Sequence, residues 1–267
     1  FKKIIDMEEV IILCGGKGTR LSEETKLKPK PMVEIGGKPI LWHIMKSYSN
    51  YGYKKFILAL GYKGHAIKSY FYNSRINQSD FTIKMDPLEK PTYHNTLIDS
   101  DWEISLIDTG EETLKGGRIK KLEKYIKNDN FFVTYGDGVA DINIKKLLEF
   151  HKSHKRIATV SAVRPPSRFG EILIENDNVL SFEEKPQMKE GFINGGFFVF
   201  NRKIFNHLHD KVDCDLEFGA LQKIAENKQM NAFKHYGFWQ CMDNIREKNY
   251  LNELSEKGKE VWLKTKK

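Results

Sequence analysis

The sequence has little cysteine and no cysteine motif. Only Cys14, Cys214 and Cys241 occur among 267 residues, an odd number without a C-x-x-C pair. This pattern argues against a disulfide framework and against a structural zinc site. We therefore predict free, partly buried thiols and a reducing, cytoplasmic environment.

Long apolar segments are also missing. No run approaches the roughly 18–20 residues that span a bilayer, and no signal peptide precedes the first predicted strand. We therefore expect no membrane partner. The chain begins with Phe1, and we expect residues 1–6 (FKKIID) to be a cloning scar or an extension before Met7.

Positive charge is present without being clustered. Forty-four Lys and Arg against thirty-six Asp and Glu give a formal net charge of +8. Such an excess suits an anionic partner, whether nucleic acid, acidic lipid or a phosphorylated small molecule. Because neither a basic cluster nor a stripe of stacking aromatic residues is visible, we expect no nucleic-acid partner.

The apolar pattern predicts an α/β fold. Short runs such as VIIL, FILAL, FFVTY and ATVSAV alternate with helical patterns such as KPILWHIMKSYSNYG and DINIKKLLEFHKSH. The first of these helices would place Leu41, Ile44, Met45 and Tyr48 on one face and end near Gly52. This alternation predicts a Rossmann-like, doubly wound sheet, mixed but mostly parallel, with helices on both sides.

Two regions depart from that alternation. Residues 74–108 combine short strands with polar loops, and we interpret them as an insertion over the edge of the sheet. After Val160 the strands come closer together, and EILIENDNVLSF predicts a hairpin about NDN where antiparallel strands extend the sheet. We predict a single domain over residues 7–267, with a C-terminal β/helix extension from about residue 160.

A glycine-rich segment follows the first predicted strand. LCGGKGTRLSEETKLKPKPM matches neither a dinucleotide fingerprint, which needs a glycine at position 21, nor a P-loop. Gly15, Gly16 and Gly18 would let the backbone approach a triphosphate, and Arg20 could bind phosphates with two N–H groups. The turn alone would need no function, but with Arg20 and Lys30 it indicates a phosphate site.

Two aspartates are candidate ligands of a divalent metal ion. Asp137 lies in a Gly-Asp-Gly turn after FFVTY, and Asp243 follows GFWQCM and precedes a predicted helix. Sites in open parallel sheets lie beyond the carboxyl ends of the strands, and Mg²⁺ prefers one or two carboxylates with phosphate oxygens. Asp137 could also be an ordinary turn residue, and Asp243 a helix N-cap, a metal ligand or both.

Two weaker segments indicate a second ligand. Glu184 and Lys185 in FEEKP combine an acceptor for hydroxyl groups with a cation for a phosphate. Asn194 in INGG precedes two glycines, which would allow close contact with a polyhydroxylated ring.

In order and spacing, GGKGTRL, KPKPM, YGDG, RFG, EEKP, NGG and WQCMD resemble the sugar-1-phosphate nucleotidyltransferases, from about Val10 to Leu254. Within that group, the longer strings DTGEETLKGGRIKKL and TYGDGVADINI resemble the glucose-1-phosphate cytidylyltransferases. The resemblance implies transfer of CMP from CTP to α-D-glucose 1-phosphate, Mg²⁺ as cofactor, and a homo-oligomer, with a hexamer favoured.

The resemblance also implies roles for individual residues. Arg20, Lys30 and Asp137 would be catalytic, and Asp137 and Asp243 would hold Mg²⁺. The glucose 1-phosphate site, in the C-terminal part, would comprise Gly170, Glu184, Lys185 and Asn194. The CTP site would comprise Leu13, Cys14, Gly15, Gly16, Lys17, Gly18, Thr19, Arg20, Lys30, Thr113, Arg118, Gly136 and Asp137.

The chain departs from the usual pattern of this family at three places. Cys14 replaces an alanine, Cys241 replaces a proline, and DLEFGAL lacks the proline that usually follows the glutamate, here Glu217. We expect activity to be retained because both cysteines are small. The alternatives are a thymidylyl- or uridylyltransferase for another sugar 1-phosphate and, less favoured, a non-catalytic sugar-nucleotide sensor.

Overall fold

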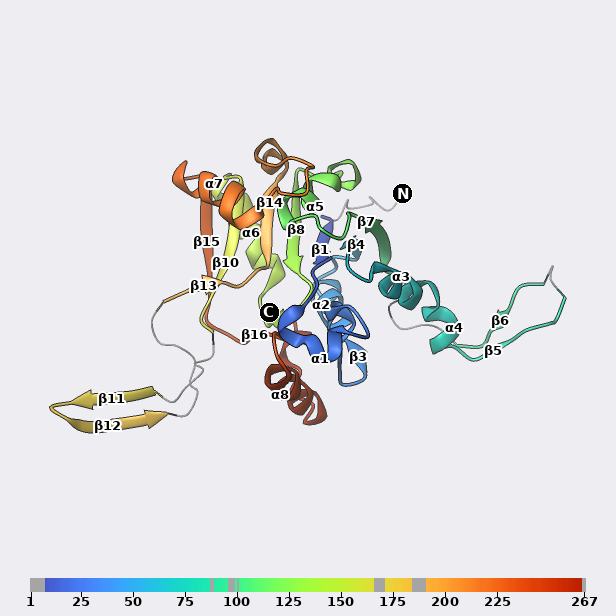
Figure 1. Ribbon diagram of the computed structural model, residues 1–267, viewed down its shortest axis with the longest axis horizontal. Helices are drawn as coiled ribbons and strands as arrows, with labels where there is room; N and C mark the ends of the chain where they lie inside the picture. Colours follow the sequence, from blue (N-terminus) through green and yellow to red (C-terminus); the bar gives the residue numbers. More distant parts are fainter. Residues whose placement is uncertain are drawn as a thin grey trace.

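A central eight-stranded sheet organises the computed structural model, which describes residues 8–86, 89–95, 99, 101–165, 171–183 and 191–265 (Figure 1). The predicted site residues Gly170, Glu184 and Lys185 lie outside these ranges, as does the segment 1–6. In spatial order the strands are β13 (Ile193–Asn194), β10 (Ala158–Val163), β14 (Phe198–Asn201), β8 (Asn130–Tyr135), β1 (Val10–Cys14), β4 (Lys55–Leu60) and β7 (Glu103–Asp108), and β15 (Met230–His235) pairs with β10.

The sheet is mixed and mostly parallel, which confirms the predicted fold class. β1 pairs in parallel with β4 and β8, β4 pairs in parallel with β7, and β10 with β15. β14 is antiparallel to both of its neighbours, β8 and β10. The main parallel part of the sheet therefore comes from strands early in the chain, β1, β4, β7 and β8, and the antiparallel pairs involve strands from later in the chain.

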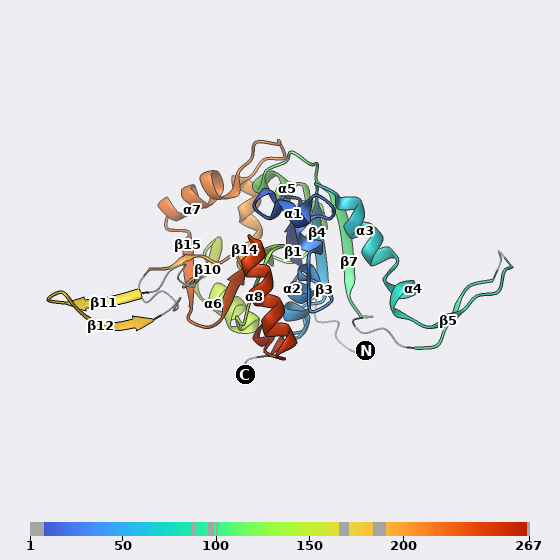
Figure 2. The same cartoon turned by 60° about the horizontal axis from the view of Figure 1, so that its bottom comes forward.

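Helices cover both faces of the sheet (Figure 2). Successive side chains of a strand point to opposite faces, so Ile12 and Ile11 of β1 enter two different cores, and both are fully buried. The core around Ile12 includes residues of α2 (Ile40–Ser49), α6 (Ile144–His154) and α8 (Ile245–Glu256). The core around Ile11 includes residues of α5 (Lys115–Lys121) and α7 (Gln222–Glu226).

The amphipathic helix predicted after Pro39 is present as α2. It buries Leu41, Ile44, Met45 and Tyr48, the four residues that the apolar spacing placed on one face. Shortly after the helix the chain turns at Gly52, whose φ of 95° favours glycine.

The segment 74–108 is an insertion only in its first part. α4 (Ser74–Gln78), β5 (Phe81–Thr82) and β6 (Thr92–Tyr93) follow α3 (Gly64–Tyr72) and project from one side of the molecule (Figure 1). The last part of the segment is β7, an edge strand of the central sheet next to β4. The predicted boundary was wrong here because a half-exposed edge strand, EISLID, has a weak apolar signal.

The hairpin predicted about NDN is present as β11 (Glu171–Glu175) and β12 (Asn178–Glu183). Asn176 and Asp177 at its turn both have positive φ, as a two-residue hairpin turn requires. The hairpin forms a separate two-stranded sheet and projects away from the body (Figure 1). The hairpin itself therefore does not extend the central sheet. The antiparallel strands predicted after Val160 are β13 and β14, which extend the sheet, and β15 adds to it in parallel.

Short elements complete the architecture. α1 (Ser22–Thr25) follows the glycine-rich loop, β2 (Glu34–Ile35) pairs with β3 (Lys38–Pro39), and β9 (Gly138–Ala140) pairs with β16 (Trp239–Cys241). Among the described residues, no helix combines the length and the apolar character needed to cross a bilayer.

Candidate active site

The loops that follow four strands meet at one edge of the sheet, and three of these loops carry residues predicted to bind the nucleotide. The loop beginning at Gly15 follows β1, Gly61 follows β4, Thr109 follows β7, and Gly136 follows β8. These four strands are neighbours and run in parallel. Their carboxyl ends therefore lie side by side, which is where open α/β sheets bind ligands.

A buried arginine fastens this edge together. Arg118 of α5 donates to the backbone oxygens of Gly15 (3.1 Å), Leu60 (2.9 Å) and Glu111 (2.9 Å) and to Thr109 Oγ1 (2.7 Å). Its terminal guanidinium nitrogens are thus committed to protein oxygens from three strand ends. Arg118 thus lies among the residues predicted to bind the nucleotide, and its hydrogen bonds position the glycine loop.

The segment between Thr109 and Leu114 forms the wall opposite the glycine loop. The Thr113 hydroxyl is buried and donates to the Thr109 carbonyl oxygen (2.7 Å). Glu112 forms an ion pair with Lys17 of the glycine loop (2.7 Å). This pair joins two segments that are about a hundred residues apart, Lys17 and Glu112 being separated by 95 positions.

These walls enclose a cavity of about 420 Å³. Every residue predicted to bind the nucleotide lines it, from Leu13 through Arg20 together with Lys30, Thr113, Arg118, Gly136 and Asp137. The structure also places Pro31, Glu111, Glu112, Leu114, Lys115, Tyr135 and Asp215 around it.

Charged side chains converge on one side of this cavity. Lys30 Nζ lies 2.6 Å from Asp137 Oδ2 and 2.5 Å from Asp243 Oδ1, and Arg20 pairs with Asp243 Oδ2 at 2.6 Å. Burial by itself lowers the pKa of Lys30, but the charges and hydrogen bonds of the two carboxylates outweigh burial and raise it. Lys30 therefore remains an ammonium ion although its side chain is only 9% exposed.

Strand pairing brings the two aspartates together. Gly138 in β9 lies opposite Cys241 in the antiparallel strand β16. Asp137 directly precedes this pair on one strand and Asp243 follows it by two residues on the other, so both lie at the same end of the ladder. The Met242 N–H also donates to the Asp137 carbonyl oxygen (2.8 Å). The N-cap of α8 is Asn244 rather than Asp243, so that alternative is wrong. The Asp243 carboxylate is therefore available to the site.

The donor set of Asp137 and Asp243 fits a hard divalent cation. Two neighbouring carboxylates match the preference of Mg²⁺ for carboxylate and phosphate oxygens, and the Lys30 ammonium that contacts both shows that this position favours positive charge.

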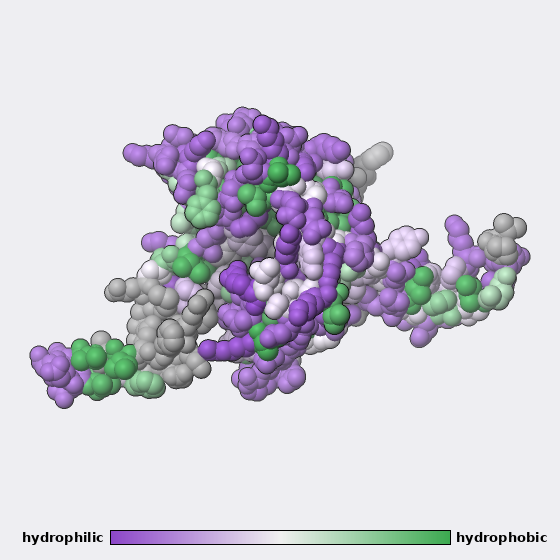
Figure 3. All heavy atoms as spheres, viewed as in Figure 1, coloured by the Kyte–Doolittle hydropathy of each residue, from purple (hydrophilic) through white to green (hydrophobic). Residues whose placement is uncertain are grey.

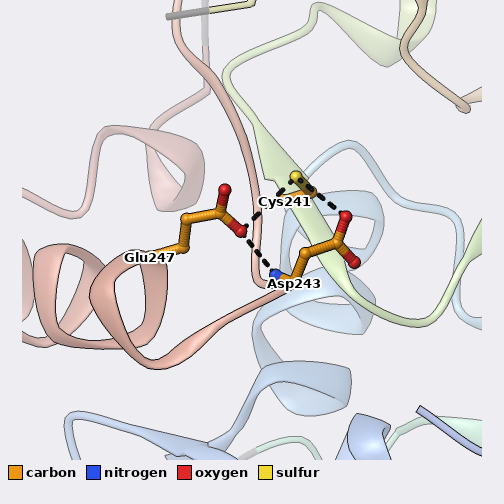
Figure 4. Close-up of side chains that lie close together, drawn as sticks. All are labelled: Cys241, Asp243 and Glu247. Carbon is orange, nitrogen blue, oxygen red and sulfur yellow. Dashed lines mark hydrogen bonds between the residues drawn. The ribbon is translucent and has the colours of Figure 1, made fainter. Parts of the chain in front are cut away.

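A second group of potential ligands shares Asp243 with this pair and adds Cys241 and Glu247 (Figure 4). Burial, followed by the charges of Glu247 and Asp243, raises the pKa of the Cys241 thiol to about 12. Glu247 Oε2 accepts the Asp243 backbone N–H at 2.5 Å. This group suits Mg²⁺ less well than the two aspartates, because a hard cation prefers oxygen ligands to sulfur and Glu247 already supports the backbone of Asp243.

A smaller cavity of about 350 Å³ adjoins the first. Asn194 lies on its wall, with its side chain held by two hydrogen bonds, from Nδ2 to the Tyr135 hydroxyl (3.0 Å) and from the Gly196 N–H to Oδ1 (2.9 Å). Trp239 Nε1 donates to the Gly195 carbonyl oxygen (2.8 Å) and fixes the same strand end. Of the four residues predicted to bind the sugar phosphate, Asn194 alone lies within the described ranges, and it lines this cavity.

Lys115 and Tyr135, which have no predicted role, line both cavities, and Glu217 contacts them both. The Tyr135 hydroxyl and Lys115 Nζ both contact Glu217 Oε1, at 2.7 and 2.5 Å. Tyr135 and Lys115 directly precede predicted positions, Gly136 and the GGR of Arg118. Glu217 comes from a π-helical turn, Leu216–Leu221, whose approach to β8 has no local sequence signal.

Known proteins resemble this chain in sequence and in fold. The profile of the Nucleotidyl transferase family matches residues 9–241. Glucose-1-phosphate cytidylyltransferase from Salmonella typhi is 49% identical over 255 residues, 95% of this chain and 98% of that protein. D-glycero-alpha-D-manno-heptose 1-phosphate guanylyltransferase from Campylobacter jejuni is 34% identical over 200 residues, 74% of this chain and 78% of that protein. The solved structure of HddC from Yersinia pseudotuberculosis complexed with GMP-PN is 29% identical, with a TM-score of 0.64, over 92% of this chain and 99% of that chain. The chain therefore belongs to the nucleotidyl transferase family.

Proposed function

We propose that this chain is a glucose-1-phosphate cytidylyltransferase, which converts CTP and α-D-glucose 1-phosphate into CDP-glucose and pyrophosphate. The observation that supports this most is the 49% identity to the Salmonella typhi cytidylyltransferase over nearly the full length of both proteins. The product would serve as a precursor of deoxysugars and surface polysaccharides.

The two adjoining cavities suit the two substrates. The larger one takes CTP, whose phosphates lie along the backbone of the loop from Gly15 to Gly18. The smaller one takes glucose 1-phosphate, with Asn194 beside the sugar, and we assign Gly170, Glu184 and Lys185 to the same ligand. Arg20 and Asp137 line both cavities, so they stand where the sugar phosphate meets the α-phosphorus of CTP.

The reaction is an in-line attack of a sugar phosphate oxygen on that α-phosphorus. The sugar phosphate is already a dianion near neutral pH, so no general base is required. The obstacle is the repulsion between two anions and the charge that develops on departing pyrophosphate. Arg20 and Lys30 stabilise this charge, and the preformed cavities hold the reacting groups in line.

Asp137 and Asp243 would hold Mg²⁺, which supplies positive charge to the phosphate oxygens when it is bound. Lys30 contacts both carboxylates in the ligand-free chain, and each Lys ammonium has three N–H donors. We infer that Lys30 exchanges one of these contacts for a phosphate oxygen when CTP binds. The side chain thereby orients the α-phosphate while the carboxylates stay in place.

Pyrophosphate release with glucose 1-phosphate, measured across CTP, UTP, dTTP, GTP and ATP, tests the proposal. We expect CTP to give the highest kcat/KM. A preference for dTTP or UTP would show the thymidylyl- or uridylyltransferase alternative to be correct, and GTP is included because a 34% identical relative is a guanylyltransferase. Binding of a sugar nucleotide without pyrophosphate release from any pair would indicate a sensor.

We also propose a cytoplasmic homo-oligomer, with a hexamer favoured. All three cysteines are free, which agrees with a reducing location. The β11–β12 hairpin carries exposed apolar side chains far from the body (Figure 3), including Ile174 and Phe182, which are 60% and 63% exposed. A two-stranded hairpin is marginal alone, and exposed apolar surface marks interfaces. Light scattering on a gel-filtration column tests this, and a monomer at micromolar concentration would contradict it.

A further inference from the structure

Among the residues that the structure describes, four line both cavities and therefore mark the junction between them. They are Arg20, Lys115, Tyr135 and Asp137. Because the two substrates must touch for the reaction to occur, the α-phosphate and the sugar phosphate have to meet at this junction. Arg20 and Asp137 already have proposed roles there, whereas Lys115 is a cation at the same place without one.

We propose that Lys115 is a further substrate-binding residue, whose ammonium group contacts the phosphates that meet at the junction. The proposal rests on the proposed nucleotidyl transfer, but it concerns phosphate recognition and is independent of which base or sugar is used. Glu217 is then a positioning residue that holds Lys115 in place.

The surroundings of Lys115 hold its ammonium without enclosing it. Nζ lies 2.5 Å from Glu217 Oε1 and 5.1 Å from the centre of the Tyr135 ring. The Tyr135 hydroxyl donates to the same Oε1 at 2.7 Å, which fixes the carboxylate. An ammonium has three N–H donors, and the Lys115 side chain is 47% exposed. One donor is directed to Glu217, and the others remain for a ligand.

Charge at the junction gives Lys115 a distinct role. Arg20 pairs with Asp243, and Lys30 pairs with both Asp137 and Asp243, the carboxylates proposed to hold the metal. Lys115 pairs instead with Glu217, which contacts neither Arg20 nor Lys30. The proposed metal ligands therefore do not engage the Lys115 ammonium. A cation of this kind offsets the repulsion between the two substrate phosphates.

Stability offers a weak explanation for the same ion pair. Half-exposed pairs contribute little to the free energy of unfolding, because water screens the charges and ordering the side chains costs entropy. Lys120 on the same helix provides the comparison, since it pairs with Glu123 at 2.7 Å and lines neither cavity. Lys120 also donates to the Phe205 carbonyl oxygen (3.1 Å) and is the less exposed of the two lysines. Its replacement should therefore cost at least as much stability as that of Lys115, and a loss of activity confined to Lys115 would come from its place at the junction.

The test compares wild type with Lys115→Met, Lys115→Arg and Lys120→Met. Pyrophosphate release is measured while glucose 1-phosphate is varied at saturating CTP and Mg²⁺, and melting temperatures are recorded for all four proteins. We expect Lys115→Met to lower kcat/KM for glucose 1-phosphate by about 10- to 100-fold, the range for losing a hydrogen bond to a charged group. Lys115→Arg keeps the charge and should stay within about threefold of wild type, and Lys120→Met should match wild type.

The outcomes separate the proposal from its rivals. A Lys115→Met enzyme with wild-type kcat/KM overturns it, and so does an equal loss in Lys115→Met and Lys120→Met. If Lys115→Met lowers the melting temperature, Lys115→Arg decides, because activity restored by the arginine supports a charge contact and activity that stays lost opposes it. If wild type releases no pyrophosphate with any substrate pair, the proposed function fails, and calorimetric affinities for glucose 1-phosphate and CTP then decide on Lys115. In that case, equal affinities of wild type and Lys115→Met for these ligands would overturn the proposal for Lys115.

Discussion

Substituting Gly15 with alanine tests whether Arg118 holds the nucleotide loop. A Cβ atom on Gly15 would lie 2.1 Å from Arg118 Nη1 and 2.2 Å from Cζ. Ordinary contacts between such atoms begin near 3.4 Å, so the guanidinium would have to shift by about 1.3 Å. Gly15 has no positive φ, so the expected effect comes from this overlap and not from the backbone conformation.

The shift removes hydrogen bonds from a buried charge. The bonds from Arg118 to the Gly15 and Leu60 carbonyl oxygens, at 3.1 and 2.9 Å, cannot both survive it. A hydrogen bond to a charged group contributes about 1.5–3 kcal/mol, and the loop can relax in part. We therefore expect Gly15→Ala to lower the free energy of unfolding by about 3 kcal/mol. Displacement of the loop should also weaken CTP binding by at least about tenfold.

Gly16→Ala is the matched control, because a Cβ there meets no atom within 4 Å and the residue has no positive φ. By restricting the unfolded chain it should leave stability unchanged or raise it by up to about 1 kcal/mol. Urea unfolding of the three proteins and calorimetric titration with CTP give both quantities. If the free energies of unfolding of Gly15→Ala and Gly16→Ala lie within about 1 kcal/mol of each other, the packing of Arg118 does not hold the glycine loop in position. That result would refute the reasoning.

Two further predictions concern charge. Asp137→Asn should abolish pyrophosphate release and leave the urea midpoint near that of wild type. Asp101→Asn, at an exposed aspartate, is the control. Turnover of Asp137→Asn near the wild-type rate would show the metal assignment to be wrong. Burial, followed by the charges of His154 and Lys152, lowers the pKa of His151 from 6.5 to about 4. Between pH 6.5 and pH 4 the unfolded chain therefore protonates this histidine while the folded chain keeps it neutral. The free energy of unfolding is unaffected by this group above pH 6.5 and falls toward pH 4, by up to about 3 kcal/mol. His151→Gln should show a shallower fall in urea unfolding over that range, and an identical slope would contradict the assignment.

Local patterns were sufficient for much of the fold and for one wall of the site. α2 is recognisable because its apolar residues recur on one face at helical spacing. β1 is recognisable as a short continuous apolar run, because both of its faces are buried. The loop from Leu13 to Arg20 is contiguous, so its residues line the cavity together. β7 was misread as part of an insertion because an edge strand, EISLID, needs fewer apolar residues.

The sequence by itself determined the alternation of strands and helices, the glycine loop, and the residue types required at a phosphate site. Only the tertiary structure decided which charges meet. The β9–β16 pairing brings Asp137 to Asp243 across more than a hundred residues, and the Leu216–Leu221 turn carries Glu217 to Lys115. Such contacts depend on the packing of remote segments, and no local periodicity encodes them. The same reason explains Arg118, whose motif indicated a ligand contact while its buried hydrogen bonds hold three strand ends.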